Sequence, residues 1–204
     1  DYKSYIDYEL IEIEQYKNRK FKNPKLKRLA NTYINIQRNE REAIENQDLV
    51  DSIFVREWNK YQRKRYELLL DINSIVGIPV QDKNSLDSIL RAGKAIKEFN
   101  RVYGILVDTF NPKNFVVEEV TGVSEKEKRY IGDFENTTGH YINYIDISID
   151  FYDENDKVYS GFQFNPRYAW ENGTKKSFEF SIPDSDTRFK YFKVNLGEKS
   201  FRFE

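Results

Sequence analysis

The sequence contains no cysteine and no methionine, a single histidine, nine glycines and five prolines. Without cysteine, the chain cannot form disulfides, thiolate metal sites or a cysteine nucleophile. The one histidine, His140, leaves little scope for a Ser–His–Asp relay or for most zinc sites. The scattered glycines form neither GxGxxG nor GxxxxGK[ST], so the common phosphate-binding loops are missing. These absences favour a non-enzymatic protein, and the sequence predicts neither a metal site nor a cofactor.

Long apolar runs and a strong charge of one sign are also missing. No stretch approaches the 18 or so apolar residues of a membrane-spanning helix, although peripheral contact with a membrane stays open. The net charge is −1, with 20 Lys and Arg against 17 Asp and Glu in residues 1–110, and 13 against 17 in the remainder. Neither half is basic enough to demand nucleic acid as a partner. An aromatic content of 16% supplies the apolar area for a folded core.

Residues 1–110 follow the period of α-helices. Apolar residues recur every three or four positions, with breaks at Asn23-Pro24 and at Gly77. The first stripe consists of Tyr2, Ile6, Leu10, Ile13 and Tyr16. The clearest pattern is a heptad seam from Phe54 to Ile75 with one charged member, Arg65. Such an arginine usually extends to the surface, or else selects a partner helix. We expect an antiparallel bundle or hairpin in which the third and fourth helices pair, with the first two alongside.

Beyond Asp108 the period changes to two, which indicates β-strands. The clearest strand is predicted over residues 141–152. Its inward-facing side chains would be Ile145, Ile147, Ile149 and Phe151. About six or seven such segments are separated by turn residues. The predicted fold class is therefore α+β, with a helical domain over 1–110 and an immunoglobulin-like antiparallel β-sandwich over 111–204.

Three stretches of this second half resemble the FxLYD-type domains, which are small sandwich modules of bacterial and archaeal envelope proteins. The stretches are 132–138, 145–158 and 173–180, and the resemblance extends over about 114–196. Ile149 stands where the named motif has Phe, and Phe151 where it has Leu. The resemblance implies a sandwich fold and an envelope location, but no activity. Residues 1–110 resemble no family.

The expected location is extracellular or at the cell surface. The chain opens at Asp1 without an initiator methionine, which favours a processed protein whose targeting segment, with or without a lipid anchor, has been removed. Its richness in Lys, Asn, Ile, Glu and Tyr is typical of low-GC Firmicutes.

A basic segment lies at the predicted corner between the first two helices. Within residues 17–28 there are seven cations and no acid: Lys17, Arg19, Lys20, Lys22, Lys25, Lys27 and Arg28. Such a corner can dock on anionic lipid headgroups, teichoic acid or nucleic acid. Alternatively, it is a solvated corner balanced by Glu9, Glu12 and Glu14. Four cations of the third helix would extend the patch if they lie beside it: Arg56, Lys60, Arg63 and Lys64.

A second candidate site is aromatic. In the segment 162–170, Tyr168 and Trp170 are candidate ligand-binding residues, because exposed rings can stack on sugars or peptides. The alternative is that these rings cap the core.

Three polar features have weaker functional interpretations. His140 is expected to be a solvated turn residue rather than a switch. The turn 153–156 resembles the start of a calcium loop, but Asp and Asn are favoured in hairpin turns anyway. Asp146 and Asp150 would lie about 13 Å apart along one strand, too far for a retaining glycosidase pair.

From these observations we expect a non-enzymatic binding or accessory module of the cell envelope, with an unidentified protein or an envelope polymer as its partner. A carbohydrate- or anionic-polymer-binding module is the alternative, and a carboxylate-based hydrolase is the least favoured.

Overall fold

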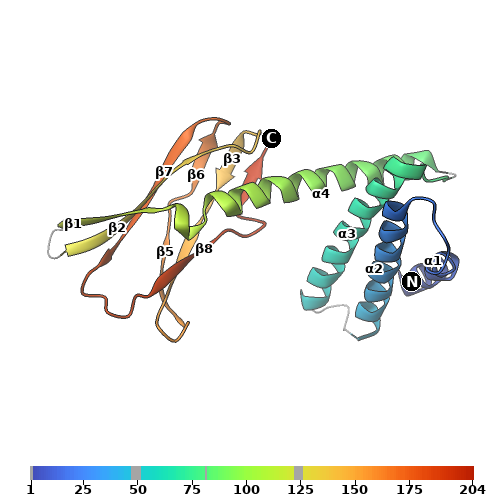
Figure 1. The fold of residues 1–204 in the computed structure, drawn as a ribbon, viewed down its shortest axis with the longest axis horizontal. Coiled ribbons are helices and arrows are strands. Elements are labelled where there is room, and N and C mark those ends of the chain that lie inside the picture. Colours follow the sequence, from blue (N-terminus) through green and yellow to red (C-terminus); the bar gives the residue numbers. More distant parts are fainter. Residues whose placement is uncertain (1, 47–51, 81, 122–125) are drawn as a thin grey trace. The chain divides into compact units, whose positions relative to one another are not determined.

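The computed structural model describes residues 2–46, 52–80, 82–121 and 126–204. The side chains of Tyr2, Asn46 and residues 52–54 lie outside this description, and with them the Phe54 end of the predicted heptad seam. The chain forms two compact units, Asp1–Asn100 and Arg101–Glu204, which we call the helical unit and the β unit (Figure 1).

Four helices follow one another from the N-terminus: α1 (Tyr2–Glu14), α2 (Pro24–Asn46), α3 (Ser52–Val76) and α4 (Lys83–Thr109). The predicted start of the second helix at Pro24 is confirmed. Asn23 caps it, since its side-chain oxygen accepts the backbone N–H groups of Lys25 at 2.9 Å and Leu26 at 3.1 Å. Gly77 follows α3 with a φ of 65°, a left-handed conformation that favours glycine and ends the helix.

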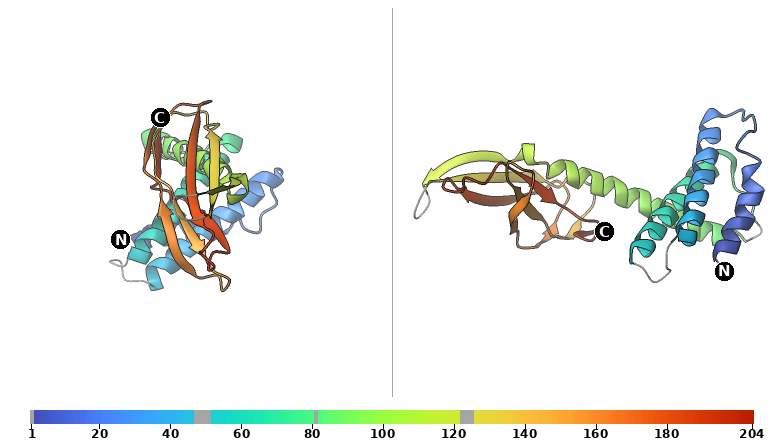
Figure 2. Two further views of the ribbon diagram at one scale, coloured as in Figure 1. Left: turned by 90° about the vertical axis from the view of Figure 1, so that its left-hand side faces the viewer. Right: turned by 90° about the horizontal axis from the view of Figure 1, so that it is seen from below.

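The helices pack in a different pairing from the predicted one. α3 lies beside α2, not α4, and runs antiparallel to it (Figures 1 and 2). α1 packs on α2. α4 instead meets α3 where Gly93 lies, and a Cβ built there would be 2.6 Å from the backbone oxygen of Tyr66. α3 and α4 also contact each other through side chains, since Lys97 pairs with Asp71 and Asn100 donates to Glu67, but α3 packs most closely on α2 and not on α4 as predicted.

The β unit contains nine strands in its described residues. They are β1 (Val116–Thr121), β2 (Lys126–Glu135), β3 (Ile142–Ile145), β4 (Ser148–Tyr152), β5 (Val158–Gln163), β6 (Arg167–Trp170), β7 (Lys175–Pro183), β8 (Tyr191–Asn195) and β9 (Phe201–Phe203). A short 3-10 turn, Pro112–Asn114, precedes them. The strands form three antiparallel sheets in the orders β1-β2-β7, β6-β3-β9 and β5-β4-β8.

The single strand expected over residues 141–152 is two strands that belong to different sheets. The chain leaves β3 after Ile145 and enters β4 at Ser148, so Asp146 and Asp150 do not share a strand. The predicted inward side chains are nevertheless confirmed, because Ile145, Ile147 and Ile149 are at most 1% exposed. The alternation of apolar residues thus identified the buried side chains even though the strand pairing changes between Ile145 and Ser148.

Aromatic rings fill the centre of the β unit. Phe180 of β7 lies 5.1 Å from Phe192 of β8 in an edge-to-face arrangement, which joins two sheets face to face. Phe110, which directly follows α4, adds a further ring whose centre lies 5.0 Å from that of Phe178 and 6.1 Å from that of Trp170. The predicted α+β class, with helices before an antiparallel sandwich, is confirmed.

Candidate functional site: a cationic corner on the helical unit

The corner between α1 and α2 exposes every one of its basic side chains. We call the seven residues the cationic corner: Lys17, Arg19, Lys20, Lys22, Lys25, Lys27 and Arg28. Helix α1 ends at Glu14, a run of turns and bends follows, and the Asn23 cap starts α2. All seven cations are exposed, four in the connection and three in the first turns of α2.

No acid neutralises this charge within the part of the chain that the structure describes, since none of the seven forms an ion pair there. Two of the acids expected to balance it are engaged elsewhere. Glu14 pairs with Arg38 of α2, and Glu9 faces the interior of the helical unit. Because like charges this close repel one another, the corner favours an anionic partner or counterions.

The cations of α3 do not extend the cationic corner. Gln62 donates to Glu40 and Arg65 donates to Tyr33, so the antiparallel register places the start of α3 beside the end of α2. The corner lies at the opposite end of α2. The four cations also have partners of their own: Arg56 and Lys60 lie against Glu57, Lys64 against Glu67, and Arg63 over the ring of Phe99.

Arg65, the charged member of the heptad seam, turns inward to a buried polar cluster. Its Nη2 lies 2.5 Å from Glu9 Oε2, and its Nε donates to the Tyr33 hydroxyl at 2.9 Å. Gln37, fully buried, donates to the same Glu9 carboxylate at 2.6 Å. Burial lowers the pKa of the Arg65 guanidinium, but the neighbouring Tyr33 and Glu9 raise it more strongly, so it stays charged. Arg65 therefore joins α1, α2 and α3 within one chain instead of selecting a partner helix.

Glu40 lies one turn beyond Gln37 on α2 and is also fully buried. Its Oε1 accepts a hydrogen bond from Gln62 at 2.9 Å, while its Oε2 has no partner among the described residues. Burial raises the pKa of Glu40 to about 7; Arg65 lowers it and Glu9 raises it further. The charge of this carboxyl therefore changes with pH near neutrality. Glu40 lies toward the end of α2 that is farther from the cationic corner.

Helix α1 carries apolar residues on two sides. Ile6 and Leu10 are buried, as the predicted stripe requires. Tyr5, Tyr8 and Ile11 are 74%, 73% and 70% exposed, and we call them the apolar face of α1. The sequence prediction missed this face because it considered only the apolar stripe that enters the core. The spacing of three between Tyr5, Tyr8 and Ile11 was the signal that could have shown a second apolar face.

The two aromatic candidates do not share a surface. Tyr168 is 62% exposed and its ring lies 5.4 Å from that of Tyr144 on the neighbouring strand. Trp170 is completely buried, and its indole N–H donates to the backbone oxygen of Thr174 at 2.9 Å. Residues two apart on a regular strand share a face, but the left-handed φ of 54° at Ala169 interrupts the strand between Tyr168 and Trp170. Trp170 is thus a core residue and not part of an exposed stacking platform.

The remaining polar candidates have structural partners. His140 is half-buried, and its Nδ1 lies 2.8 Å from the backbone oxygen of Glu204. The Asp153 carboxylate accepts the backbone N–H groups of Asn155 and Lys157, which is the geometry of a turn. Asp146 accepts hydrogen bonds from Gln163 and Tyr144. Within the described residues, no three His, Cys, Asp or Glu side chains gather as metal ligands would.

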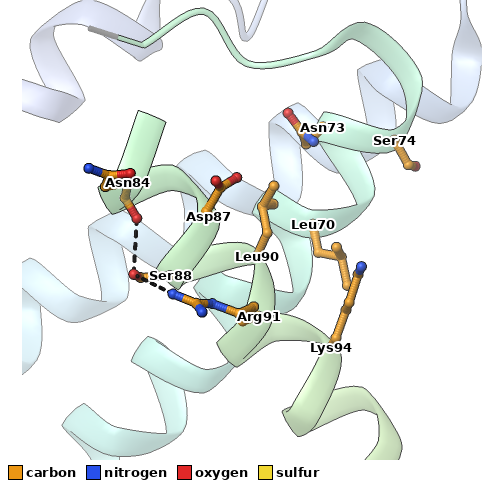
Figure 3. Close-up of a pocket in the computed structure, with 9 residues that line it drawn as sticks. All are labelled: Leu70, Asn73, Ser74, Asn84, Asp87, Ser88, Leu90, Arg91 and Lys94. Carbon is orange, nitrogen blue, oxygen red and sulfur yellow. Dashed lines mark hydrogen bonds between the residues drawn. The ribbon is translucent and has the colours of Figure 1, made fainter. Parts of the chain in front are cut away.

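An open pocket of about 600 Å³ lies between the end of α3 and the start of α4 (Figure 3). Its lining is Leu70, Asn73, Ser74, Asn84, Asp87, Ser88, Leu90, Arg91 and Lys94. Arg91 donates to Ser88, which in turn donates to the backbone oxygen of Asn84 (Figure 3). The charged groups are exposed, so the pocket lacks the convergent buried polar groups of a small-molecule site.

The chain matches no protein-family model and no curated protein. None of the helices in the described residues is both long enough and apolar enough to cross a membrane. Packing within the fold does not explain why the cationic corner is exposed, nor why the apolar face of α1, which precedes it in sequence, is exposed.

Proposed function

We propose that this chain is a non-enzymatic binding module of the bacterial cell envelope, exported to the cell surface, whose cationic corner binds a phosphate-rich anionic partner. The observation that carries the proposal is the exposure of seven cations without ion pairs among the described residues, next to acids that are occupied elsewhere. Lipid headgroups and wall teichoic acids share the phosphodiester chemistry that such a corner fits. The FxLYD-type resemblance of residues 114–196 supports the envelope location and a supporting role for the β unit.

The test reverses the charge of four corner residues, Lys20, Lys22, Lys25 and Lys27, to glutamate. Each cation near an anionic surface contributes about 1 kcal/mol, so loss of four weakens binding by about 4 kcal/mol, or nearly a thousand-fold, and repulsion by the four new carboxylates weakens it further. Binding of the full chain to purified wall sacculi and to anionic vesicles is measured by co-sedimentation at increasing salt. Wild-type binding should fall steeply with salt.

A matched control changes the net charge equally but in the β unit. It carries glutamate at Lys113, Lys128, Lys157 and Lys175, which are all exposed. We expect this control to bind as the wild type does. Equal loss in both variants would show a non-specific charge effect, and absence of wild-type binding to every anionic surface would refute the proposal.

A second candidate function, carbohydrate binding, rests on the exposed ring of Tyr168, which lies 5.4 Å from the ring of the half-buried Tyr144. An exposed ring on a strand surface can hold a sugar ring by its apolar face. Tyr168→Ala should abolish binding to neutral wall glycan while leaving salt-sensitive binding through the corner intact. Unchanged glycan binding by this variant would rule out the Tyr168 ring as the binding site.

A further inference from the structure

The apolar face of α1 is held outward by charged contacts on the other side of the helix. Asp7 pairs with Arg41 and Glu14 with Arg38. These two ion pairs hold α1 against α2 at points that are about two turns apart on α1 and about one turn apart on α2. Lys3 adds a third contact to Glu45 at 2.9 Å. With Ile6 and Leu10 buried between the helices, Tyr5, Tyr8 and Ile11 have no rotation of α1 available that would bury them.

This face continues into the cationic corner. Gln15 and Tyr16 follow Ile11 by one turn, and both are exposed. Arg19 contacts both, since its Nη2 donates to Gln15 Oε1 at 2.7 Å and its guanidinium lies 4.8 Å from the centre of the Tyr16 ring. One cation of the corner, Arg19, is therefore fixed at the end of the helix that exposes three large apolar side chains.

We propose that the anionic partner of the cationic corner is the headgroup layer of a phospholipid membrane, and that the apolar face of α1 enters that layer. This inference rests on the function proposed above for the corner. Tyrosine rings prefer the membrane interface, where the ring is among the upper acyl chains and the hydroxyl reaches water. A wall polymer of sugars and phosphates offers no apolar layer for Ile11, so charge alone would not account for this face. Glu12 is the one exposed acid among the described residues of α1, against seven corner cations.

The chain itself provides a site-specific probe, because it contains no cysteine. Ile11→Cys is labelled with an environment-sensitive fluorophore and titrated with vesicles of phosphatidylglycerol and phosphatidylcholine. Val158→Cys, at an exposed apolar position of β5, is the labelled control. We expect a blue shift and a several-fold gain in emission for the label at position 11, no change at position 158, and no change with pure phosphatidylcholine.

A second variant removes the apolar face while keeping the helix: Tyr5→Gln, Tyr8→Gln and Ile11→Gln together. Because these side chains are exposed, circular dichroism should be unchanged. Affinity for anionic vesicles should fall by about ten-fold or more, whereas binding to soluble polyphosphate should be retained.

The outcomes separate the two proposals. If the protein sediments with anionic vesicles but the label at position 11 does not respond and the triple variant binds normally, the corner acts alone and membrane insertion is wrong. If the protein binds sacculi or polyphosphate but no vesicle, the partner is a polymer, and this inference falls while the proposed function stands. If it binds no anionic surface, both fail.

Discussion

Replacing Glu40 with glutamine removes the one carboxyl group that is completely buried among the described residues of the helical unit. Glutamine has nearly the same shape as glutamate. It keeps an oxygen that can accept the hydrogen bond from Gln62, which is 2.9 Å long in the wild type. It also replaces Glu40 Oε2, which has no hydrogen-bond partner among the described residues, with a neutral amide group. The substitution therefore changes charge and little else.

The size and sign of the effect follow from the pKa of Glu40, which burial raises from 4.5 to about 7 in the folded chain. Between these values the folded state binds a proton that the unfolded state has released, so stability falls as pH rises. Each pH unit contributes about 1.4 kcal/mol, which amounts to about 3 kcal/mol over the interval. This stability is fully present below pH 4.5 and is lost once the pH exceeds about 7.

Three groups face Glu40 and modulate this value. Arg65 favours the charged form, as does the hydrogen bond from Gln62, whereas Glu9 opposes it. Tyr33 stays neutral in this range, because burial raises its pKa further above the ordinary value. Glu40 is thus expected to be the principal source of pH dependence near neutrality in the helical unit.

The assay is urea unfolding of the full chain at pH 4.5 and pH 8, followed by circular dichroism at 222 nm, which reports chiefly on the helices. Glu40→Gln should be more stable than the wild type by about 2–3 kcal/mol at pH 8 and nearly equal to it at pH 4.5. Glu42→Gln, on the exposed side of α2, is the control and should show no pH-dependent difference.

Two results would refute this reasoning. A Glu40→Gln difference that is the same at both pH values would mean that the carboxyl does not titrate differently in the folded state. A variant that is less stable than the wild type at pH 8 would mean that the attraction to Arg65 outweighs burial.

Three further expectations concern stability and binding. Gly93→Ala should destabilise the helical unit by about 1–3 kcal/mol in urea unfolding, because the added Cβ meets a backbone oxygen of α3 at 2.6 Å. Gly104→Ala, which meets nothing within 4 Å, should instead stabilise the chain by up to about 1 kcal/mol, and similar effects of both changes would contradict the crossing geometry. Trp170→Ala should cost about 3–5 kcal/mol in unfolding free energy, whereas Tyr168→Ala should stay within about 0.5 kcal/mol; a small loss at Trp170 would contradict its core position. Glu12→Lys should strengthen binding to anionic vesicles about five- to ten-fold at low salt, measured by titration, and no gain would argue against contact of α1 with the surface.

Local signals in the sequence were sufficient for several helix boundaries and for the buried side of the central strands. The cap at Asn23-Pro24 and the glycine at position 77 each depend on neighbours within a few residues, and the structure has helix boundaries at both. The alternation through Ile145, Ile147 and Ile149 identified the buried side chains correctly. Short strands were missed: β6 and β9 have four and three residues, too few for a period to emerge.

Pairing between elements was where sequence reasoning failed. A heptad seam predicts that α3 buries a stripe of side chains, but it does not predict which helix covers that stripe. In the structure α3 packs most closely on α2, where α4 was expected. Likewise, 56 positions separate Glu9 from Arg65, so no local pattern connects them. The sequence left open whether Trp170 binds a ligand or caps the core, and the structure places it in the core. No local pattern announces the left-handed Ala169 that separates it from the exposed Tyr168.

The sequence by itself determined the α+β class, the start of α2 and the end of α3, the inward side of the central strands and the concentration of charge at residues 17–28, because each depends on composition or on short-range patterns. Only the tertiary structure decided that the cationic corner lacks neutralising acids among the described residues, that Arg65 faces inward, that Glu40 is buried and that Tyr5, Tyr8 and Ile11 remain exposed. Those properties depend on which surfaces of distant segments come together, and burial and charge compensation are set by that contact rather than by any residue's own type.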